Sequence, residues 1–333
     1  MSAGPPDLHQ TRMRPAAEPP FHDELAEVWG DRWGAWDEVG PLRRVLVRAP
    51  GNEWESIRAD AWDEAAQALV DPEGQWYWTD REPPDMDKVR AQHAGLVAAL
   101  EAEGVDVVVA EPLGGRFTKA IYIRDPLVTV PGGAVIGRMA VAMRRGEEAD
   151  VTRRVAAEGL AILHTVTGTG TLEGGSLVKL RDGLAAFGTS IRCNQEGALQ
   201  LQSVFARIGW ELLIVPLTGY TIHLDLHLTM VDDGRALVDV PGLPFWFLEE
   251  LEARGFELLY PDRDEEWALN ALALRPGRIL MAEGSPRTVE RLTEAGVDVV
   301  TVPYDEIQKA GGGVHCSTME LLRDPAGPSA ATA

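Results

Sequence analysis

Short apolar runs that end at turn residues are the main pattern along this chain. They lie at 42–50, 105–112, 127–137, 176–188, 212–217, 228–240, 278–284 and 297–303. Three of these runs contain a glycine turn near the middle, at residues 131–133, 181–183 and 232–234. Because glycine adopts the positive φ values that tight hairpin turns require, each of the three predicts a β-hairpin.

Helical periodicity separates the apolar runs. Residues 86–103 place Val89, Leu96 and Leu100 near one face, and Gly104 ends the pattern. Similar patterns cover 147–160, 195–208 and 286–295. Helix and strand units therefore recur about five times, which predicts an internally repeated α/β architecture.

The composition fits a single large domain with a buried core. The chain has 333 residues, of which 45% are hydrophobic. It lacks the run of roughly 18 apolar residues that would predict a membrane span. Residues 1–20, rich in Pro and Ala, predict a disordered leader rather than a signal peptide, and residues 325–333 predict a disordered tail. One folded domain over 21–324 remains.

Acidic residues outnumber basic ones. There are 52 Asp and Glu against 31 Lys and Arg, which gives a formal net charge of −21. Such a surface repels phosphate backbones, so nucleic acid is not an expected partner. The charge fits either a cleft that attracts a small cation or a general requirement for solubility.

A tryptophan-rich segment at 51–84 separates the first predicted strand from the first long helix. Seven of the ten tryptophans precede residue 80, and the segment is polar and interrupted by proline. It fits a lid over a site, a surface for a partner, or tryptophans that pack against the rim of the core.

Cys316 is a candidate nucleophile. It follows three glycines in GGGVHCST, and successive glycines let a backbone approach a ligand closely. The alternative is a small buried side chain, the commoner role of a lone cysteine. The other cysteine is Cys193. Two cysteines are too few for a disulfide framework and fit a reducing cytoplasm, and neither has a zinc-type spacing.

The sequence His223-Leu224-Asp225-Leu226-His227 is a second candidate. In a strand, alternate side chains share a face, so the two histidines and the aspartate would project together. That arrangement suits a general acid or base beside a carboxylate. It equally suits a metal site formed by His223, Asp225 and His227, or histidines that are hydrogen-bonded in the core.

Two further carboxylates stand at predicted strand edges. Asp125 lies in YIRDP just before one strand, and Glu173 lies in LEGGS before another. Each alone could be an ordinary loop residue. Together with a cysteine and a histidine they suggest one site, and carboxylates suit a guanidinium, which is planar, charged and rich in donors.

Five motifs in order carry a family resemblance. IYIRDP with RRGEE, LEGGS, FGTSIRCN, HLDLHLTMVDDG and GGGVHCST are similar to motifs of the guanidino-group-modifying superfamily. Arginine deiminase, dimethylarginine dimethylaminohydrolase and glycine amidinotransferase belong to it. The resemblance runs from about residue 40 to about residue 324. It implies the pentein fold, a five-bladed pseudo-symmetric α/β-propeller, and hence a single catalytic domain over 21–324.

The resemblance implies catalytic roles for five residues. Cys316 corresponds to the nucleophile, His223 to the catalytic histidine and Glu173 to the acid that partners it. Asp125 and Asp225 correspond to the carboxylates that hold the guanidinium nitrogens. The thiolate would attack the guanidinium carbon, and His223 would protonate the departing amine and then activate water. No metal or organic cofactor is implied.

Other matching positions concern the substrate. Arg144 and Arg192 correspond to arginines that hold the substrate's α-carboxylate, and Arg138 or Arg145 could replace Arg144. Three departures from the family pattern bear on substrate identity, and one is the segment 51–84, an insertion that matches nothing in the family. Ser176 stands where the family often has aspartate, and Cys193 stands where threonine is usual.

The resemblance also ranks possible activities. Asp225 is typical of the deiminase and amidinotransferase branches, and dimethylargininases typically lack it. We therefore expect an arginine deiminase-like cysteine hydrolase, with an amidinotransferase as the first alternative because GGGVHC is similar to the ending of that branch. Dimethylarginine hydrolysis and, more remotely, metal-dependent hydrolysis complete the set. The expected protein is cytoplasmic, binds a small guanidino substrate but no membrane, and could form a homo-oligomer.

Overall fold

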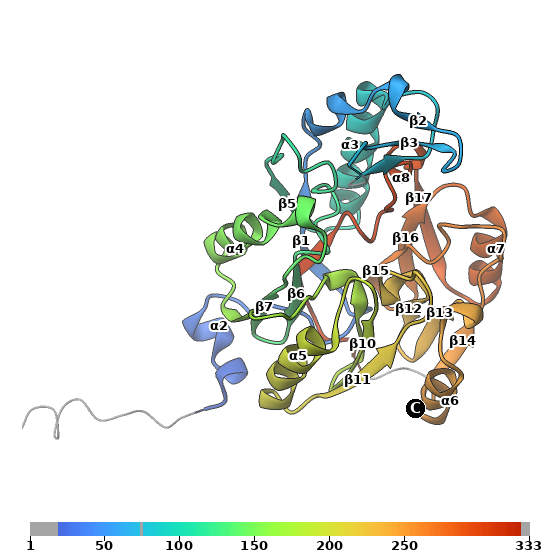
Figure 1. Ribbon diagram of the computed structural model, residues 1–333. Coiled ribbons are helices and arrows are strands. Elements are labelled where there is room, and N and C mark those ends of the chain that lie inside the picture. Colours follow the sequence, from blue (N-terminus) through green and yellow to red (C-terminus); the bar gives the residue numbers. More distant parts are fainter. Residues whose placement is uncertain (1–18, 74–75, 328–333) are drawn as a thin grey trace, which may run out of the picture.

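The computed structural model describes residues 19–73 and 76–327 (Figure 1). Most of the expected leader (1–18) and the end of the expected tail (328–333) therefore lie outside the described residues. The described chain begins with the 3-10 turn Phe21–Asp23 and the short helix α2 (Leu25–Val28).

Five three-stranded sheets share one pattern of strand pairing. In each, the middle strand pairs antiparallel with one neighbour and parallel with the other, and a helix connects the two parallel strands. The expected mixed α/β fold is confirmed. The strands are β1 (Leu42–Arg48), β5 (Asp106–Ala110) and β18 (Met319–Arg323); β6 (Leu127–Val130), β7 (Gly133–Ile136) and β8 (Ile162–Thr165); β9 (Leu177–Arg181), β10 (Leu184–Thr189) and β11 (Glu211–Pro216); β12 (Leu228–Asp232), β13 (Arg235–Val238) and β14 (Glu257–Leu259); β15 (Leu272–Arg275), β16 (Arg278–Ala282) and β17 (Asp298–Val302).

The connecting helices lie around the outside of the molecule, and the strands lie between them (Figure 1). Each helix buries an apolar face against the strands. Phe247 and Leu251 of α6, for example, belong to the same buried cluster as Leu237 of β13. The helices are α3 (Met86–Ala102), α4 (Glu147–Glu158), α5 (Gln195–Arg207), α6 (Phe245–Ala253) and α7 (Pro286–Glu294), with the short α8 (Asp305–Gln308) near the C-terminus.

The three predicted hairpins are present as β6–β7, β9–β10 and β12–β13. Their turns contain glycines at positive φ, including Gly183 at 82° and Gly234 at 70°. A fourth hairpin, β15–β16, turns at Gly277 with φ 69°, and the apolar pattern did not predict it. The pattern also missed α6, whose first four residues are all apolar, so that the helical period is weak.

The two ends of the folded chain share one sheet. β18 pairs antiparallel with β1, with Val45 opposite Glu320 and Leu46 opposite Met319. Cys316 lies just before β18, so this pairing fixes the cysteine segment against the first strand.

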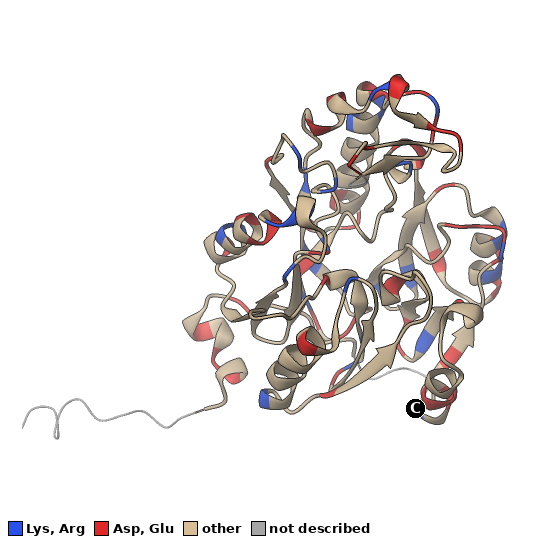
Figure 2. Ribbon diagram, in the orientation of Figure 1, with Lys and Arg blue, Asp and Glu red and all other residues tan. Residues whose placement is uncertain are grey.

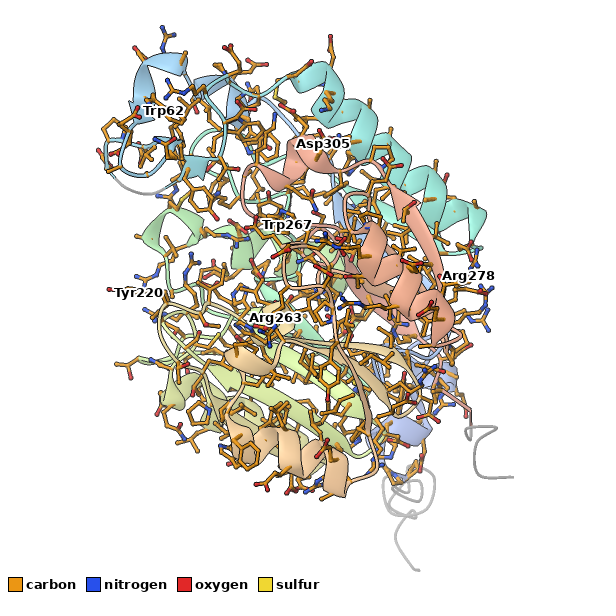
Figure 3. The ribbon with its side chains drawn as sticks, turned by 90° about the vertical axis from the view of Figure 1, so that its right-hand side faces the viewer. Trp62, Tyr220, Arg263, Trp267, Arg278 and Asp305 are labelled. Carbon is orange, nitrogen blue, oxygen red and sulfur yellow. The ribbon has the colours of Figure 1, made fainter. Side chains whose placement is uncertain are left out.

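The tryptophan-rich segment forms a small sixth sheet from β2 (Trp62–Asp63), β3 (Ala68–Val70) and β4 (Tyr77–Trp78). Trp54 and Trp78 are buried and meet edge to face, with ring centroids 5.4 Å apart. Trp62 lies at the outer part of this sheet, where Arg81 stacks over its ring (Figure 3). The segment therefore adds aromatic side chains to the core beside β1.

Acidic residues are distributed over the peripheral elements rather than confined to one side (Figure 2). Among the helices of the described residues, none combines the length and hydropathy that a transmembrane segment requires.

Candidate active site

A cavity of about 350 Å³ lies where loops from several sheets meet. Its lining includes Tyr77 from the small sheet and residues from five loops that adjoin the other sheets. These are Lys119, Tyr122, Asp125, Arg144, Arg192, His223, Gly311 and Cys316. Residues as distant in the chain as Tyr77 and Cys316 therefore converge on one cavity. The Tyr122 hydroxyl also donates a hydrogen bond to the Ile307 carbonyl, 185 positions away.

Cys316 lies in the turn that precedes β18, and its side chain lines the cavity. Its Sγ accepts a hydrogen bond of 3.0 Å from Asn270 Nδ2, and Asn270 Oδ1 in turn accepts from the backbone N–H of His315 at 2.8 Å. Asn270 therefore holds both the sulfur and the backbone beside it. Sequence reasoning missed this residue, because a single asparagine before β15 carries no recognisable signal.

The glycines before Cys316 are needed for close side-chain packing. A Cβ on Gly313 would lie 2.5 Å from Asn270 Oδ1, and a Cβ on Gly312 would collide with the Tyr122 ring. The glycine run was predicted to allow close approach of a ligand, but in the structure protein side chains fill the space.

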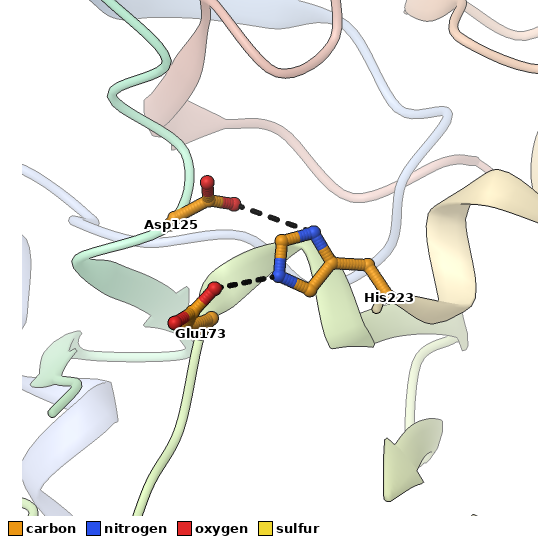
Figure 4. A group of neighbouring side chains, drawn as sticks. All are labelled: Asp125, Glu173 and His223. Atoms are coloured by element: carbon orange, nitrogen blue, oxygen red, sulfur yellow. Dashed lines mark hydrogen bonds and ion pairs between the residues drawn. The ribbon is translucent and has the colours of Figure 1, made fainter. Parts of the chain in front are cut away.

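His223 lies between two carboxylates (Figure 4). Its Nε2 is 2.9 Å from Glu173 Oε2, and its Nδ1 is 3.7 Å from Asp125 Oδ1. Burial disfavours the charged imidazole, but the charges of Asp125 and Glu173 outweigh it and raise the pKa of His223. The histidine can therefore hold a proton for transfer at neutral pH.

Glu173 is fully buried and held by several donors. Besides His223, it accepts 2.9 Å from the N–H of Ala140 and 3.2 Å from Arg192 Nη1. Burial alone would raise the pKa of Glu173, but the bond to His223 and the nearby arginines lower it to about 2. This carboxylate stays ionised and orients the imidazole.

Gly175 makes room for the histidine. A Cβ at this position would lie 2.7 Å from His223 Nδ1 and 3.1 Å from Asp225 Oδ1. The second glycine of LEGGS is thus explained by the approach of the catalytic side chains to the backbone.

Asp125 and Asp225 each present an unsatisfied oxygen. Asp125 Oδ2 accepts from Arg144 and Asp225 Oδ2 accepts from His315 Nδ1 at 2.9 Å, whereas both Oδ1 atoms are buried without a hydrogen bond. Burial opposes ionisation of Asp225, but the bond to His315 lowers its pKa. Asp125 lines the cavity and Asp225 does not, although its neighbours His223 and Leu226 do. Buried carboxylate oxygens without donors are suited to a cationic ligand with N–H groups.

The expected strand through His223 and His227 is wrong. Residues Leu224–Leu226 form a 3-10 turn, so the two-residue periodicity does not apply. His227 instead bonds Asp239 Oδ2 at 2.9 Å. Among the described residues, Asp125, Glu173 and His223 have possible ligand atoms that all lie within 4.8 Å of one another. His223, Asp225 and His227 do not form such a group, so the geometry does not support a metal site made by these three residues.

The predicted arginines differ in their surroundings. Arg144 is buried and donates to Asp125, to both oxygens of Glu147 at 2.8 Å and to the Tyr122 carbonyl at 3.0 Å. It therefore orients Asp125. Arg192 lines the cavity with a side chain that is 26% exposed.

Arg138 and Arg145 were considered as replacements for Arg144. They donate to the backbone carbonyls of Gly170 and Met139, each at 3.1 Å, and neither lines the cavity. The structure thus places Arg144 and Arg192, and not these two, at the cavity.

Lys119 is a cavity residue that sequence reasoning missed. Its Nζ donates to the carbonyls of Ala310 and Tyr77 and lies 4.1 Å from the centre of the Tyr77 ring. Burial and the charges of Arg144 and Arg192 lower the pKa of Lys119 to about 7. A lysine six positions before Asp125 has no motif of its own, so only the fold reveals it.

The Cys316 thiol is protonated in this arrangement. Burial, followed by the charges of Asp225 and Asp125, raises its pKa to about 12. Cys193 has a similarly raised pKa, also about 12, but its sulfur bonds the backbone of Glu173 and does not line the cavity.

Comparisons with known proteins show that the chain is a guanidino-modifying enzyme of the pentein superfamily. A family model described as "N,N dimethylarginine dimethylhydrolase, eukaryotic" matches residues 66–323, so the chain belongs to the dimethylarginine dimethylaminohydrolase family. The N(G),N(G)-dimethylarginine dimethylaminohydrolase of Streptomyces coelicolor is 30% identical over 286 residues, which cover 84% of this chain and 98% of that protein.

A further relative is similar in sequence, and a solved structure is similar in fold. The enzyme of the same name from Pseudomonas aeruginosa is 27% identical over 238 residues, covering 72% of this chain and 90% of that protein. A solved structure of the dimethylarginine dimethylaminohydrolase from Pseudomonas aeruginosa, in complex with citrulline, has a TM-score of 0.69 at 23% identity and covers 85% of this chain and all of that one. The expected superfamily is confirmed. The expectation that arginine deiminase is the first candidate activity is not confirmed, because the family match favours the dimethylarginine branch.

Proposed function

We propose that this protein hydrolyses the guanidino group of a small molecule through a covalent intermediate on Cys316. The observation that carries the proposal is the pair of buried oxygens, Asp125 Oδ1 and Asp225 Oδ1, that lack donors. A guanidinium held between them satisfies both, because its N–H groups form a planar fork that matches carboxylates.

Binding of the cation also activates the thiol. The two aspartates raise the pKa of Cys316, and a guanidinium between them neutralises that effect and adds a positive charge next to the sulfur. Substrate binding therefore lowers the pKa of the thiol, and the thiolate forms where its electrophile lies.

The chemistry then proceeds in two halves. The thiolate adds to the guanidinium carbon, His223 donates its proton to the departing amine, and the carbon–nitrogen bond breaks to leave an S-linked thiouronium. The neutral His223 next takes a proton from water, which adds to the same carbon. The carbon–sulfur bond breaks and the added hydroxyl gives its remaining proton to solvent, which regenerates the thiolate and releases a neutral ureido product. Glu173 stabilises the imidazolium in both halves.

Two substrate types are supported by different observations. The free oxygen of Asp225 offers an acceptor to an unmethylated nitrogen, which favours deiminase-like release of ammonia. The family match favours a dimethylated guanidine and release of dimethylamine. We propose the unmethylated guanidine first, because a dimethylated nitrogen has no N–H to offer a second buried carboxylate.

We further propose that the five repeated sheets close into a five-bladed propeller within one catalytic domain over 21–324. Contacts between neighbouring sheets, β9 with β12, β12 with β15, β15 with β1 and β18 with β6, support this arrangement.

The test is a product assay with intact-protein mass spectrometry. Arginine and dimethylarginine are incubated with and without glycine, and citrulline, ornithine and dimethylamine are measured. His223→Ala should trap an adduct on the peptide that contains Cys316, with the Cys193 peptide as an internal control. Ornithine that forms only with glycine would instead identify amidino transfer. Turnover retained by Cys316→Ala would contradict the proposal.

A further inference from the structure

The charges that line the cavity are unevenly distributed. Among its described lining residues, Lys119, Arg144 and Arg192 are cations, and Asp125 is the carboxylate. Asp125 lies at the His223 end, where the guanidinium is proposed to bind. The rest of the charged lining is therefore basic, although the protein as a whole has a net charge of −21.

Lys119 and Arg192 retain capacity to bind an anion. An ammonium has three N–H donors, and the carbonyls of Ala310 and Tyr77 take two from Lys119. A guanidinium has five, and the bond from Arg192 Nη1 to Glu173 uses one. Arg144 differs, because Asp125, Glu147 and backbone carbonyls occupy its donors.

The same wall is unfavourable to a second cation. Arginine has an α-ammonium next to its α-carboxylate, so binding its carboxylate to Lys119 and Arg192 would bring the ammonium close to both. Glu266 is exposed and does not line the cavity. Within the described lining, an ammonium there has no carboxylate partner.

We propose that the substrate is a guanidino acid whose far end is an anion without an adjacent ammonium, bound by Lys119 and Arg192. This inference rests on the proposed function, because Asp125 and Asp225 hold the guanidinium end. Tyr77 and Tyr122 provide the apolar walls between the two ends.

The protonation state of Lys119 makes the preference for a carboxylate substrate dependent on pH. Its pKa, about 7, results from burial and from Arg144 and Arg192, with Tyr77 the titratable group in contact with it. Below that pH the ammonium attracts a carboxylate, and above it the neutral amine does not. The advantage of a carboxylate substrate in the free enzyme should therefore fall as pH rises through 7.

Three guanidines with matched chains test the proposal. Arginine has both α-groups, 5-guanidinopentanoate lacks the ammonium, and agmatine lacks the carboxylate. We expect kcat/KM to be highest for 5-guanidinopentanoate and lowest for agmatine. The ratio of kcat/KM for 5-guanidinopentanoate to that for agmatine should fall with rising pH, and groups that act on both substrates, such as Cys316 and His223, cancel in this ratio.

Variants at position 119 provide a second test of the substrate assignment. Lys119→Met should lower kcat/KM for 5-guanidinopentanoate by roughly 10- to 100-fold, the usual effect of losing a charge-assisted hydrogen bond, and should raise kcat/KM for agmatine, because it removes a repulsion between two cations. Lys119→Arg should keep the preference but lose its dependence on pH near 7. Lys88→Met, which removes a lysine paired with Asp305 away from the cavity, is the matched control.

The outcomes separate the two proposals. Turnover of arginine that exceeds that of 5-guanidinopentanoate, or an equal loss for all three substrates in Lys119→Met, would overturn the substrate assignment while leaving the Cys316 chemistry intact. If no guanidine gives a ureido product or an adduct on Cys316, the proposed function fails and the assignment fails with it.

Discussion

The positions of the catalytic side chains depend on nearby glycines, which leave room where another residue would have a Cβ. Gly175 is the clearest case, because a Cβ there would lie 2.7 Å from His223 Nδ1, closer than such atoms can approach. His223 is buried between Glu173 and Asp125, so it has little freedom to move away. A single methyl group would therefore displace the imidazole.

Gly175→Ala should lower kcat by about 100-fold, the usual cost of a displacement near 1 Å in a catalytic group. Steady-state kinetics and thermal unfolding would measure the effect. Gly95→Ala is the control, because Gly95 lies in α3 with open space around it and should gain about 0.5–1 kcal/mol of stability with unchanged kinetics. Unaltered kcat in Gly175→Ala would show that the imidazole position tolerates the methyl group.

The sequence contains part of this residue-level arrangement. Cys316, His223, Glu173, Asp125 and Asp225 lie in motifs that could be recognised together, and the structure brings them to one place. Their partners could not be recognised, because contacts such as those of Asn270 and His315 depend on how distant loops meet. The short repeat around His223 was misleading for a physical reason: alternation predicts a shared face only if the backbone is extended, and here it turns.

At the scale of elements, the tryptophan-rich segment has two roles that its composition did not separate. Trp78 is fully buried and packs against Trp54, whereas the adjacent Tyr77 is 45% exposed and lines the cavity. Alternate residues of β4 thus face the core and the cavity, as strand geometry requires. The sequence showed many aromatics in a polar segment, but it could not show which of them faced inward.

The two residues should respond differently to truncation. Trp78→Ala should reduce the free energy of unfolding by about 3–5 kcal/mol, because it removes a large buried aromatic side chain. Tyr77→Ala should change stability by less and should raise KM, because it removes one wall of the cavity. Urea denaturation and steady-state kinetics would measure both. Equal loss of stability in the two variants would show that the segment acts only as packing.

At the scale of the whole molecule, a buried network of charges connects the core to the site. Glu320 of β18 accepts 2.7 Å bonds from Arg124 Nη2 and from Lys179 Nζ of β9. Arg124 Nε also donates to the carbonyls of His315 and Thr318, each at 3.0 Å. Arg124, which is adjacent to Asp125, thereby holds the turn that contains Cys316. Sequence patterns predicted repeated sheets, but charges at full burial have no periodic signal and were not foreseen.

Glu320→Ala should leave Arg124 and Lys179 as buried cations with reduced compensation, since Glu38 also pairs with Lys179 at 2.8 Å. Removal of one partner from a buried ion pair costs about 3–5 kcal/mol, so the variant should unfold at a clearly lower urea concentration. It should also lose activity, because Arg124 is free to leave the carbonyls that it holds. Glu257→Ala, which removes an exposed partner of Arg235, should change stability by no more than about 0.5 kcal/mol. Equal stability of the two variants would show that the buried charges do not hold β18 in place. The pairing of β18 with β1 would then be what positions Cys316.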